Sequence, residues 1–492
     1  MTVSLRALVL ALLAALALMQ VTLWCFLGSG ALAVVGGALG LMMALVGLGR
    51  HWPAPLHVPL SDWALTTVLA LAVLLIGGEG RWFYATLDWQ VRYAVLRDLT
   101  LQPWPFAYTT PEGPLMLRLP VGMYLVPALV GKLGGFHAAE QALLVQNTLL
   151  LGMVLALGGA LYRTARHKVL ALALFWGFSG MDVIGQALQR RPLSLHLETW
   201  AGLQFSSHVT QALWVPQHAL AGWIFAVFYL LWLQGKAPGW TVLACIWLVG
   251  LLSPLALMGC VPFAAHALVA GLSRREITLR DMGWLIVVAA LCVPGLLYMV
   301  TSSGSVGAGQ SHGWQHGWLP FIVIEVGPFL VALWLVRARA PFGSMAAALV
   351  VGTLLLVPFG QVGSSMDFTA RASIPALAIL SMMMARIVID HGQWARGATA
   401  RGWIAVAWLI GLATPAGELW RGIAWPAAPE VMCGYMGVVP GGSATYTAPW
   451  GLMPAVIRPV APRHVTPRDP DRCWQAPWRD PINGAITLTH PY

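Results

Sequence analysis

The chain has 492 residues, of which 58% are hydrophobic and only 9% are charged, whereas about 25% of the residues in an ordinary soluble domain carry a charge. A chain this long with so few charges cannot cover its own surface with polar groups, so a water-soluble fold is excluded. The formal net charge of +10 comes almost wholly from arginine. In a membrane protein, such a basic excess is first a signal of topology rather than of nucleic-acid binding.

Apolar runs bounded by charged or turn residues recur along the chain at about the 17 to 25 residues that cross a bilayer. They predict an all-α polytopic membrane protein with about thirteen transmembrane helices. The predicted spans lie near residues 7–27, 31–49, 62–78, 138–161, 167–179, 214–234, 239–253, 256–272, 283–300, 319–336, 343–359, 372–389 and 402–415. Because a second span follows the first at once, we expect the first to be an uncleaved anchor rather than a signal peptide.

Basic residues sort to one side of these predicted spans. With a cytoplasmic N-terminus, every predicted inner loop carries lysine or arginine, whereas the outer connections 28–30 and 301–318 carry neither. The positive-inside rule therefore predicts an integral protein of the bacterial inner (plasma) membrane, with a cytoplasmic N-terminus and an extracytoplasmic C-terminus. Most acidic residues fall in or beside the outer loops. Either these loops are simply longer and wetter, or they line a polar cavity that faces outward.

Two outer segments, 79–137 and 180–213, are long, and long loops in compact proteins tend to carry function. In the first of them, residues 88–101 place apolar side chains at helical spacing and predict an amphipathic helix on the membrane surface. The apolar stretch 121–134 is short for a span, so we expect an interfacial or re-entrant helix there.

The C-terminal region differs in composition from the rest of the chain. We assign residues 1–415 to the transmembrane domain and residues 416–492 to an extracytoplasmic region rich in proline and tryptophan. Cys433 and Cys473 fall in this region, and extracytoplasmic cysteines can pair in an oxidising compartment. A Cys433–Cys473 disulfide is therefore predicted, with two free thiols as the alternative.

The first outer loop also resembles a known family. Asp88 begins a helix just outside a span, Pro111 and Pro114 form a Pro-x-x-Pro turn, and residues 123–147 read MYLVPALVGKLGGFHAAEQALLVQN. This order is similar to the first-loop region of GT-C membrane glycosyltransferases, closest to the branch with protein O-mannosyltransferases and lipid A aminoarabinose transferases. The resemblance covers about 90 residues. It departs from the family at Trp89, where a second acidic residue is common, and in two extra spans before the loop.

The resemblance implies a GT-C-like fold with a polyprenyl-phosphate sugar as the donor substrate. Transfer of that sugar requires a base for the acceptor hydroxyl and a cationic group for the departing phosphate. Asp88 is the first candidate for the catalytic base, because it lies just outside a span with Arg92 one helical turn later. A helix cap with a local Asp88–Arg92 ion pair is the structural alternative. Asp182, directly after a short span, is the second candidate, again with a helix cap as the alternative.

The candidates for binding the donor phosphate are Arg190, Arg191 and Arg371, since arginine offers a planar, permanently charged donor fork. Asp367 stands four residues before Arg371 at the start of an apolar helix. This spacing favours a structural ion pair, whereas ionisable residues at membrane depth are also candidates for function.

Other residues are expected to line the cavity or to position the substrate. Glu79 lies between glycines at a span exit, where a simply solvated charge is the alternative. Gln217 and His218 begin an apolar span, where they line the cavity or cap the helix. Trp89 beside Arg92 is expected to stack on a sugar face, although the interfacial aromatic belt explains most tryptophans.

A metal site is not expected. His312 and His316 lie four residues apart, a spacing that metal sites on helices use. Glycines at 313 and 317 argue against a helix there. We therefore expect no metal and no other cofactor.

Two classes of function fit these features. The first is a glycosyltransferase that moves a sugar from a polyprenyl-phosphate donor to a glycan, lipid or protein acceptor at the extracytoplasmic face. The second is a transporter or flippase of a lipid-linked or polar substrate, and a polysaccharide polymerase or ligase would share the lipid-linked substrate. Charge gathers in outer loops rather than within spans, and no paired interrupted helices suggest inverted repeats, which favours the enzyme. The expected partners are membrane lipid, the lipid-linked sugar and the acceptor, with no nucleic acid.

Overall fold

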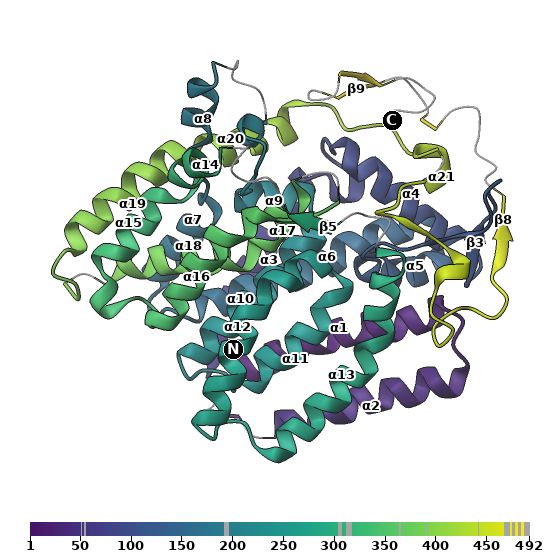
Figure 1. The fold of residues 1–492 in the computed structure, drawn as a ribbon, viewed down its shortest axis with the longest axis horizontal. Coiled ribbons are helices and arrows are strands. Elements are labelled where there is room, and N and C mark those ends of the chain that lie inside the picture. Colours follow the sequence, from purple (N-terminus) through teal and green to yellow (C-terminus); the bar gives the residue numbers. More distant parts are fainter. Residues whose placement is uncertain are drawn as a thin grey trace.

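The chain folds into a helical bundle with a few short strands (Figure 1). The computed structural model describes the chain except for residues 51, 54–55, 191–195, 304–307, 311–316, 364–365, 391, 441, 467–472, 475–477, 481–483 and 487–492. The predicted helical class is confirmed. Arg191 and the pair His312 and His316 lie outside the described residues.

Seven helical segments in the described part of the chain are long and apolar enough to cross a membrane. They are α1 (Leu5–Phe26), α2 (Ala31–Gly49), α6 (Phe136–Gly159), α10 (Pro216–Leu233), α12 (Pro254–Ser273), α13 (Leu279–Val300) and Gly397–Ala424, which comprises α19 (Gly397–Gly411) and α20 (Ala413–Ala424). An eighth forms if α14 (Trp318–Glu325) and α15 (Gly327–Leu335), bent by 64° at their junction, are one broken span. The chain is thus an integral membrane protein, and the full number of about thirteen spans stays a prediction.

The other predicted spans coincide with shorter helices, all of them apolar except α7. These are α3 (Leu60–Ile76), α7 (Ala165–Trp176), α11 (Trp240–Leu248) with the 3-10 turn η3 (Val249–Leu251), α16 (Ser344–Leu356) with η6 (Val357–Phe359), and α18 (Ile374–Ile389). At about 1.5 Å per residue, a helix of 13 residues such as α16 extends only about 20 Å. Helix α10 lies at the centre of the bundle, and almost all of its side chains are buried.

The long outer segments fold into short elements. They are η1 (Glu79–Arg81), α4 (Leu87–Leu101), β3 (Phe106–Tyr108), β4 (Leu115–Leu117), α5 (Gly122–Gly134), α8 (Asp182–Leu188), η2 (Leu197–Trp200) and α9 (His208–Trp214). Helix α5 matches the short helix expected at 121–134. Helix α4 matches the predicted helix at 88–101. It is enclosed by protein instead of lying on a membrane surface, because most of its residues are buried. Only its last residue, Leu101, is exposed.

The C-terminal region covers α4 and joins the first outer loop. Its elements are α21 (Tyr435–Val438), β7 (Thr447–Pro449), η7 (Trp450–Leu452), β8 (Arg463–Val465), β9 (Trp478–Asp480) and β10 (Gly484–Ile486). Strands β7 and β8 complete a four-stranded sheet in the order β7-β4-β3-β8. The paired strands of the first outer loop and of the C-terminal region therefore lie together, with β3 and β8 at the right of Figure 1.

Two further features of the C-terminal region bear on the sequence predictions. The predicted Cys433–Cys473 disulfide is present, with an S–S distance of 2.03 Å. The last long helix, α20, continues to Ala424, past the predicted boundary at residue 415.

Two small sheets and two short helical elements complete the described structure. Strand β1 (Thr2–Ser4) pairs with β2 (His57–Pro59), and β5 (Ala308–Gln310) pairs with β6 (Gly360–Val362). The remaining helical elements are η5 (Arg337–Arg339) and α17 (Asp367–Ala372).

Candidate functional site

A large cavity, here called the central cavity, lies where the ends of several helices meet the C-terminal region. It has a volume of about 710 Å³. Its polar wall consists of side chains from α4, α10 and α17 and from the segment before α5, whereas its apolar wall belongs mainly to α12 and α13. Its main polar lining residues are Asp88, Arg92, Arg118, Gln217, His218, Asp367 and Arg371.

Six of these polar residues were predicted from the sequence, and the structure brings them together from three helices. Asp88 and Arg92 lie on α4, Gln217 and His218 begin α10, and Asp367 and Arg371 lie on α17. These helices are far apart in the sequence, so the cavity forms only when the bundle is packed.

Both ion pairs that the sequence offered as structural alternatives are formed. Asp88 lies 3.5 Å from the Arg92 guanidinium, and Asp367 lies 2.6 Å from that of Arg371. The cap alternative for Asp88 is wrong, because Thr86 precedes the helix and Asp88 lies within its first turn. The carboxylates remain 40% and 46% exposed, whereas the arginine side chains are only 3% and 17% exposed. Each pair thus presents its carboxylate to the cavity while its guanidinium is anchored in the wall.

Close packing between α12 and α17 holds Arg371 at the cavity. A Cβ atom added to Gly259 on α12 would lie 1.9 Å from the carbonyl oxygen of Ala372, so only glycine allows this approach. Ser253 caps α12 by accepting a hydrogen bond from the Ala256 amide and also shares a 2.7 Å hydrogen bond with Nδ1 of His218. One capping residue therefore fixes the helix end and orients His218.

Sequence reasoning missed Arg118, which follows β4. This buried arginine lines the cavity, and its Nη2 donates to the carbonyl oxygen of Ala444 in the C-terminal region. Burial lowers the pKa of Arg118 from its ordinary value, but a guanidinium stays charged at neutral pH. The signal in the sequence is an arginine between two leucines in an otherwise apolar stretch of the first outer loop.

Sequence reasoning also missed the contribution of the C-terminal region to the cavity. Tyr435 and Tyr446 line it, and their rings stack with centroids 5.5 Å apart. Ser443 and Thr445 line it as well. Nothing in the local sequence pattern relates this segment to α4 or α17.

Glu79 and Trp89 are not cavity-lining residues but lie in the packed protein near α4. The interpretation of Glu79 as a solvated charge is wrong, because the residue is fully buried and both its oxygens accept from Nδ2 of Asn147 at 3.1 Å. Burial raises the pKa of Glu79 to about 8, although Asn147 and the charge of Arg92 oppose the shift. Trp89 is also fully buried, and its Nε1 donates to the carbonyl oxygen of Leu213, so it is not available for stacking on a sugar.

The structure does not bring Asp182 or Arg190 to the central cavity. Arg190 is exposed beyond the end of α8. Asp182 is the first residue of α8, is buried, and accepts hydrogen bonds from the hydroxyls of Ser179 and Thr414. The interpretation of Asp182 as a simple helix cap is therefore also incomplete, because its carboxylate ties α8 to α20.

Asp182 belongs to a buried group of acidic residues that also contains Glu198, Glu325 and Glu418. Glu418 pairs with both Arg421 and His196. Burial and the neighbouring Asp182 raise the pKa of Glu198 to about 7. Although burial alone would lower it, the hydrogen bond to Glu418 raises the pKa of His196. No arrangement suited to a metal ion is found among the described residues, here or elsewhere.

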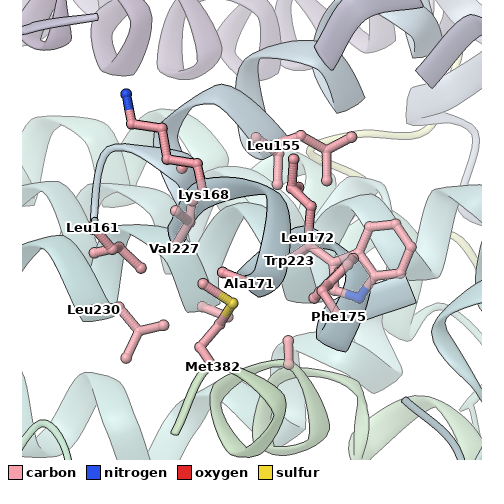
Figure 2. Close-up of a pocket in the computed structure, with 15 residues that line it drawn as sticks. Leu155, Leu161, Lys168, Ala171, Leu172, Phe175, Trp223, Val227, Leu230 and Met382 are labelled. Atoms are coloured by element: carbon pink, nitrogen blue, oxygen red, sulfur yellow. The ribbon is translucent and has the colours of Figure 1, made fainter. Parts of the chain in front are cut away.

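A second, smaller pocket between α6, α7, α10 and α18 has different chemistry (Figure 2). Its volume is about 40 Å³, and almost all its lining side chains are apolar. Lys168 is its only charged lining residue, and its ammonium group points away from the apolar side chains and pairs with Asp62 at 2.5 Å. The small pocket therefore lacks groups for binding or converting a polar substrate.

Comparison with known proteins finds no matching family model, no matching curated protein and no matching solved structure.

Proposed function

We propose that this chain is a membrane glycosyltransferase that moves a sugar from a polyprenyl-phosphate donor to an acceptor at the extracytoplasmic face of the bacterial inner membrane. The observation that carries the proposal is the two-sided lining of the central cavity. Arginines and carboxylates form one wall, and aliphatic side chains at helix ends form the other. A substrate with an anionic phosphate, a polar sugar and a long apolar chain matches this lining.

Arg371 and Arg118 bind the donor phosphate in this proposal. Both guanidinium groups lie in the cavity wall and carry permanent charge. Asp367 holds Arg371 in place through the 2.6 Å ion pair. The same two arginines stabilise the negative charge that develops on the leaving phosphate.

Asp88 acts as the general base. Its carboxylate accepts the proton of the acceptor hydroxyl while the acceptor oxygen bonds to the anomeric carbon of the sugar. The bond between that carbon and the phosphate oxygen breaks, and its electron pair leaves with the polyprenyl phosphate. Arg92, paired with Asp88, orients the carboxylate from within the wall.

The apolar wall receives the beginning of the polyprenyl chain. Met258 on α12 and Val300 at the end of α13 both line the cavity and are about half exposed. Helices α12 and α13 are each long and apolar enough to span the membrane, so we infer that the cavity opens toward lipid between these two side chains. The cavity edge between Met258 and Val300 is thus a route by which the polyprenyl chain of the donor can extend from the cavity into the bilayer.

The decisive experiment is transfer by the purified chain reconstituted in liposomes, with a panel of radiolabelled polyprenyl-phosphate sugars and a membrane acceptor fraction. We expect transfer from one donor, and a loss of at least about 100-fold in Asp88→Asn at an equal amount of membrane protein. Asp62→Asn is the matched control, because Asp62 pairs with Lys168 away from the cavity. Full transfer activity in Asp88→Asn would refute the base assignment.

The same liposomes test the alternative functions. Movement of labelled donor across the bilayer without transfer from any donor would identify a transporter or flippase. Products of increasing glycan length, or transfer of a whole preassembled glycan, would identify a polymerase or a ligase.

A further inference from the structure

A second polar hollow, here called the outer hollow, lies at the end of α4 next to the C-terminal region. Its volume is about 540 Å³. Polar groups dominate its lining, and its main polar residues are Arg97, Asp98, Gln102, Tyr108, Arg463 and His464.

The outer hollow and the central cavity share a wall. Helix α4 contributes Asp88 and Arg92 to the cavity and Arg97 and Asp98 to the hollow. At 1.5 Å per residue, Asp88 and Arg97 are about 14 Å apart along the helix. The segment around α21 repeats this division, because Tyr435 lines the cavity while Gly434 and Met436 on either side of it line the hollow.

The negative groups at the hollow are already engaged. One carboxylate oxygen of Asp98 accepts hydrogen bonds from the Tyr108 hydroxyl at 2.5 Å and from the Tyr435 amide at 2.7 Å. The carbonyl oxygens of Thr100 and Gln102, at the C-terminal end of α4, accept from Lys132 at 3.3 Å and 2.6 Å. These contacts occupy the carboxylate oxygen and both carbonyl oxygens with donors from the protein.

The positive groups are engaged differently. The Arg97 guanidinium lies 5.5 Å from the centre of the Phe136 ring, a cation–π contact that holds the side chain without neutralising it. Arg463 is exposed on strand β8, where its backbone is fixed by hydrogen bonding to Pro105. Among the ion pairs formed by described residues, none includes Arg97 or Arg463. The hollow therefore offers two arginine forks and a polar lining.

We propose that the outer hollow binds an anionic, hydroxyl-rich saccharide, with Arg97 and Arg463 contacting its negatively charged groups. Planar arginine forks match the oxygens of phosphate, sulfate and carboxylate groups. The identification of this ligand as a portion of the acceptor rests on the glycosyltransferase function proposed above. An acceptor held there lies beside the wall that carries Asp88.

The test measures binding to the full-length protein in lipid nanodiscs by calorimetry, with a sulfated, heparin-derived tetrasaccharide as the probe. We expect it to bind, with an affinity that falls as salt concentration rises. Neutral maltotetraose should not bind measurably. The double variant Arg97→Gln with Arg463→Gln should weaken binding at least about tenfold, whereas the control Arg280→Gln, at an exposed position near the start of α13, should not change it.

Several outcomes would overturn the proposal. Equal binding of maltotetraose, an affinity independent of salt, or unchanged binding by the double variant would each do so. Inorganic phosphate that displaces the tetrasaccharide at matched concentration would show a simple anion site without saccharide recognition. Because the salt series uses the wild-type protein, an affinity independent of salt would refute the proposal even where the double variant does not fold.

Failure of this proposal is distinguishable from failure of the proposed function. Tetrasaccharide binding requires no transfer, and Asp88→Asn should retain it. If the protein binds the tetrasaccharide in a salt-dependent way but transfers sugar from no donor, the glycosyltransferase function is refuted and the saccharide site is retained. Transfer without tetrasaccharide binding would support the enzyme function but refute the saccharide site in the outer hollow.

Discussion

Glu79 is a carboxylic acid enclosed by protein beside a charged cavity wall. Its pKa is raised by burial from 4.5 to about 8, so the folded protein holds a proton there that the unfolded chain releases at lower pH. The stabilisation linked to this proton is fully present below about pH 4.5 and is lost as pH rises through about 8.

We therefore predict that the thermal midpoint of the purified protein falls between about pH 5 and about pH 9. Glu79→Gln, which keeps the shape and cannot ionise, should show a smaller fall. Scanning fluorimetry across this pH range measures both, with Glu112→Gln in an exposed turn as the control. A fall in Glu79→Gln as large as in the wild type would show that Glu79 does not carry the effect.

At the residue scale, the sequence was informative where the signal was local. The spacing of Asp88 to Arg92 and of Asp367 to Arg371 predicted ion pairs that are formed. Arg118 was not found, because its partner Ala444 lies 326 positions away in the sequence. The contact of Asp182 with Thr414 on α20 could not be predicted for the same reason.

At the scale of elements, the apolar helices could be located from composition because each is a long run of hydrophobic residues. The four-stranded sheet could not, because β3, β4, β7 and β8 have only three residues each, and β3 pairs with β8 and β4 with β7 across more than 300 positions. Strands this short carry no readable alternation. The burial of α4 could not be predicted either, because the C-terminal region that completes the sheet also covers this helix.

The contact between α4 and the C-terminal region depends on a glycine. A Cβ atom added to Gly434 would lie 2.3 Å from Oδ1 of Asp98, whose Oδ2 accepts hydrogen bonds from the Tyr108 hydroxyl and the Tyr435 amide. Gly434→Ala should therefore displace Asp98 and loosen the C-terminal region from α4. We predict that limited proteolysis of the reconstituted protein cleaves this region several-fold faster.

Gly451→Ala is the matched control for this prediction, because a Cβ atom there meets no atom within 4 Å. It lies in the same region of the chain and should leave the cleavage rate unchanged. Equal rates for Gly434→Ala and the wild type would mean that Asp98 does not secure the segment.

For the whole molecule, the shared sheet relates two distant parts of the chain to one face of the membrane. The positive-inside pattern predicts that this face is extracytoplasmic. We therefore predict that Glu112→Cys and Val460→Cys, both at exposed positions, react with a membrane-impermeant maleimide in intact cells. Arg275→Cys, in a predicted inner loop, should react only after lysis.

The possible failures of the labelling experiment have different meanings. If the Glu112→Cys and Val460→Cys variants differ from one another in reactivity, the shared sheet does not form in the membrane. If both are protected and the Arg275→Cys variant reacts, the sheet stands and the orientation of the whole protein is reversed.

The half-exposed Met258 and Val300 at the edge of the central cavity have a consequence for kinetics. A substrate that reaches the cavity through the bilayer is sampled by diffusion in two dimensions, so its effective concentration is its mole fraction among the lipids. Adding inert lipid or detergent at a constant total amount of donor would then slow the reaction by surface dilution. Rate constants for this protein would be comparable between preparations only at equal donor-to-lipid ratios.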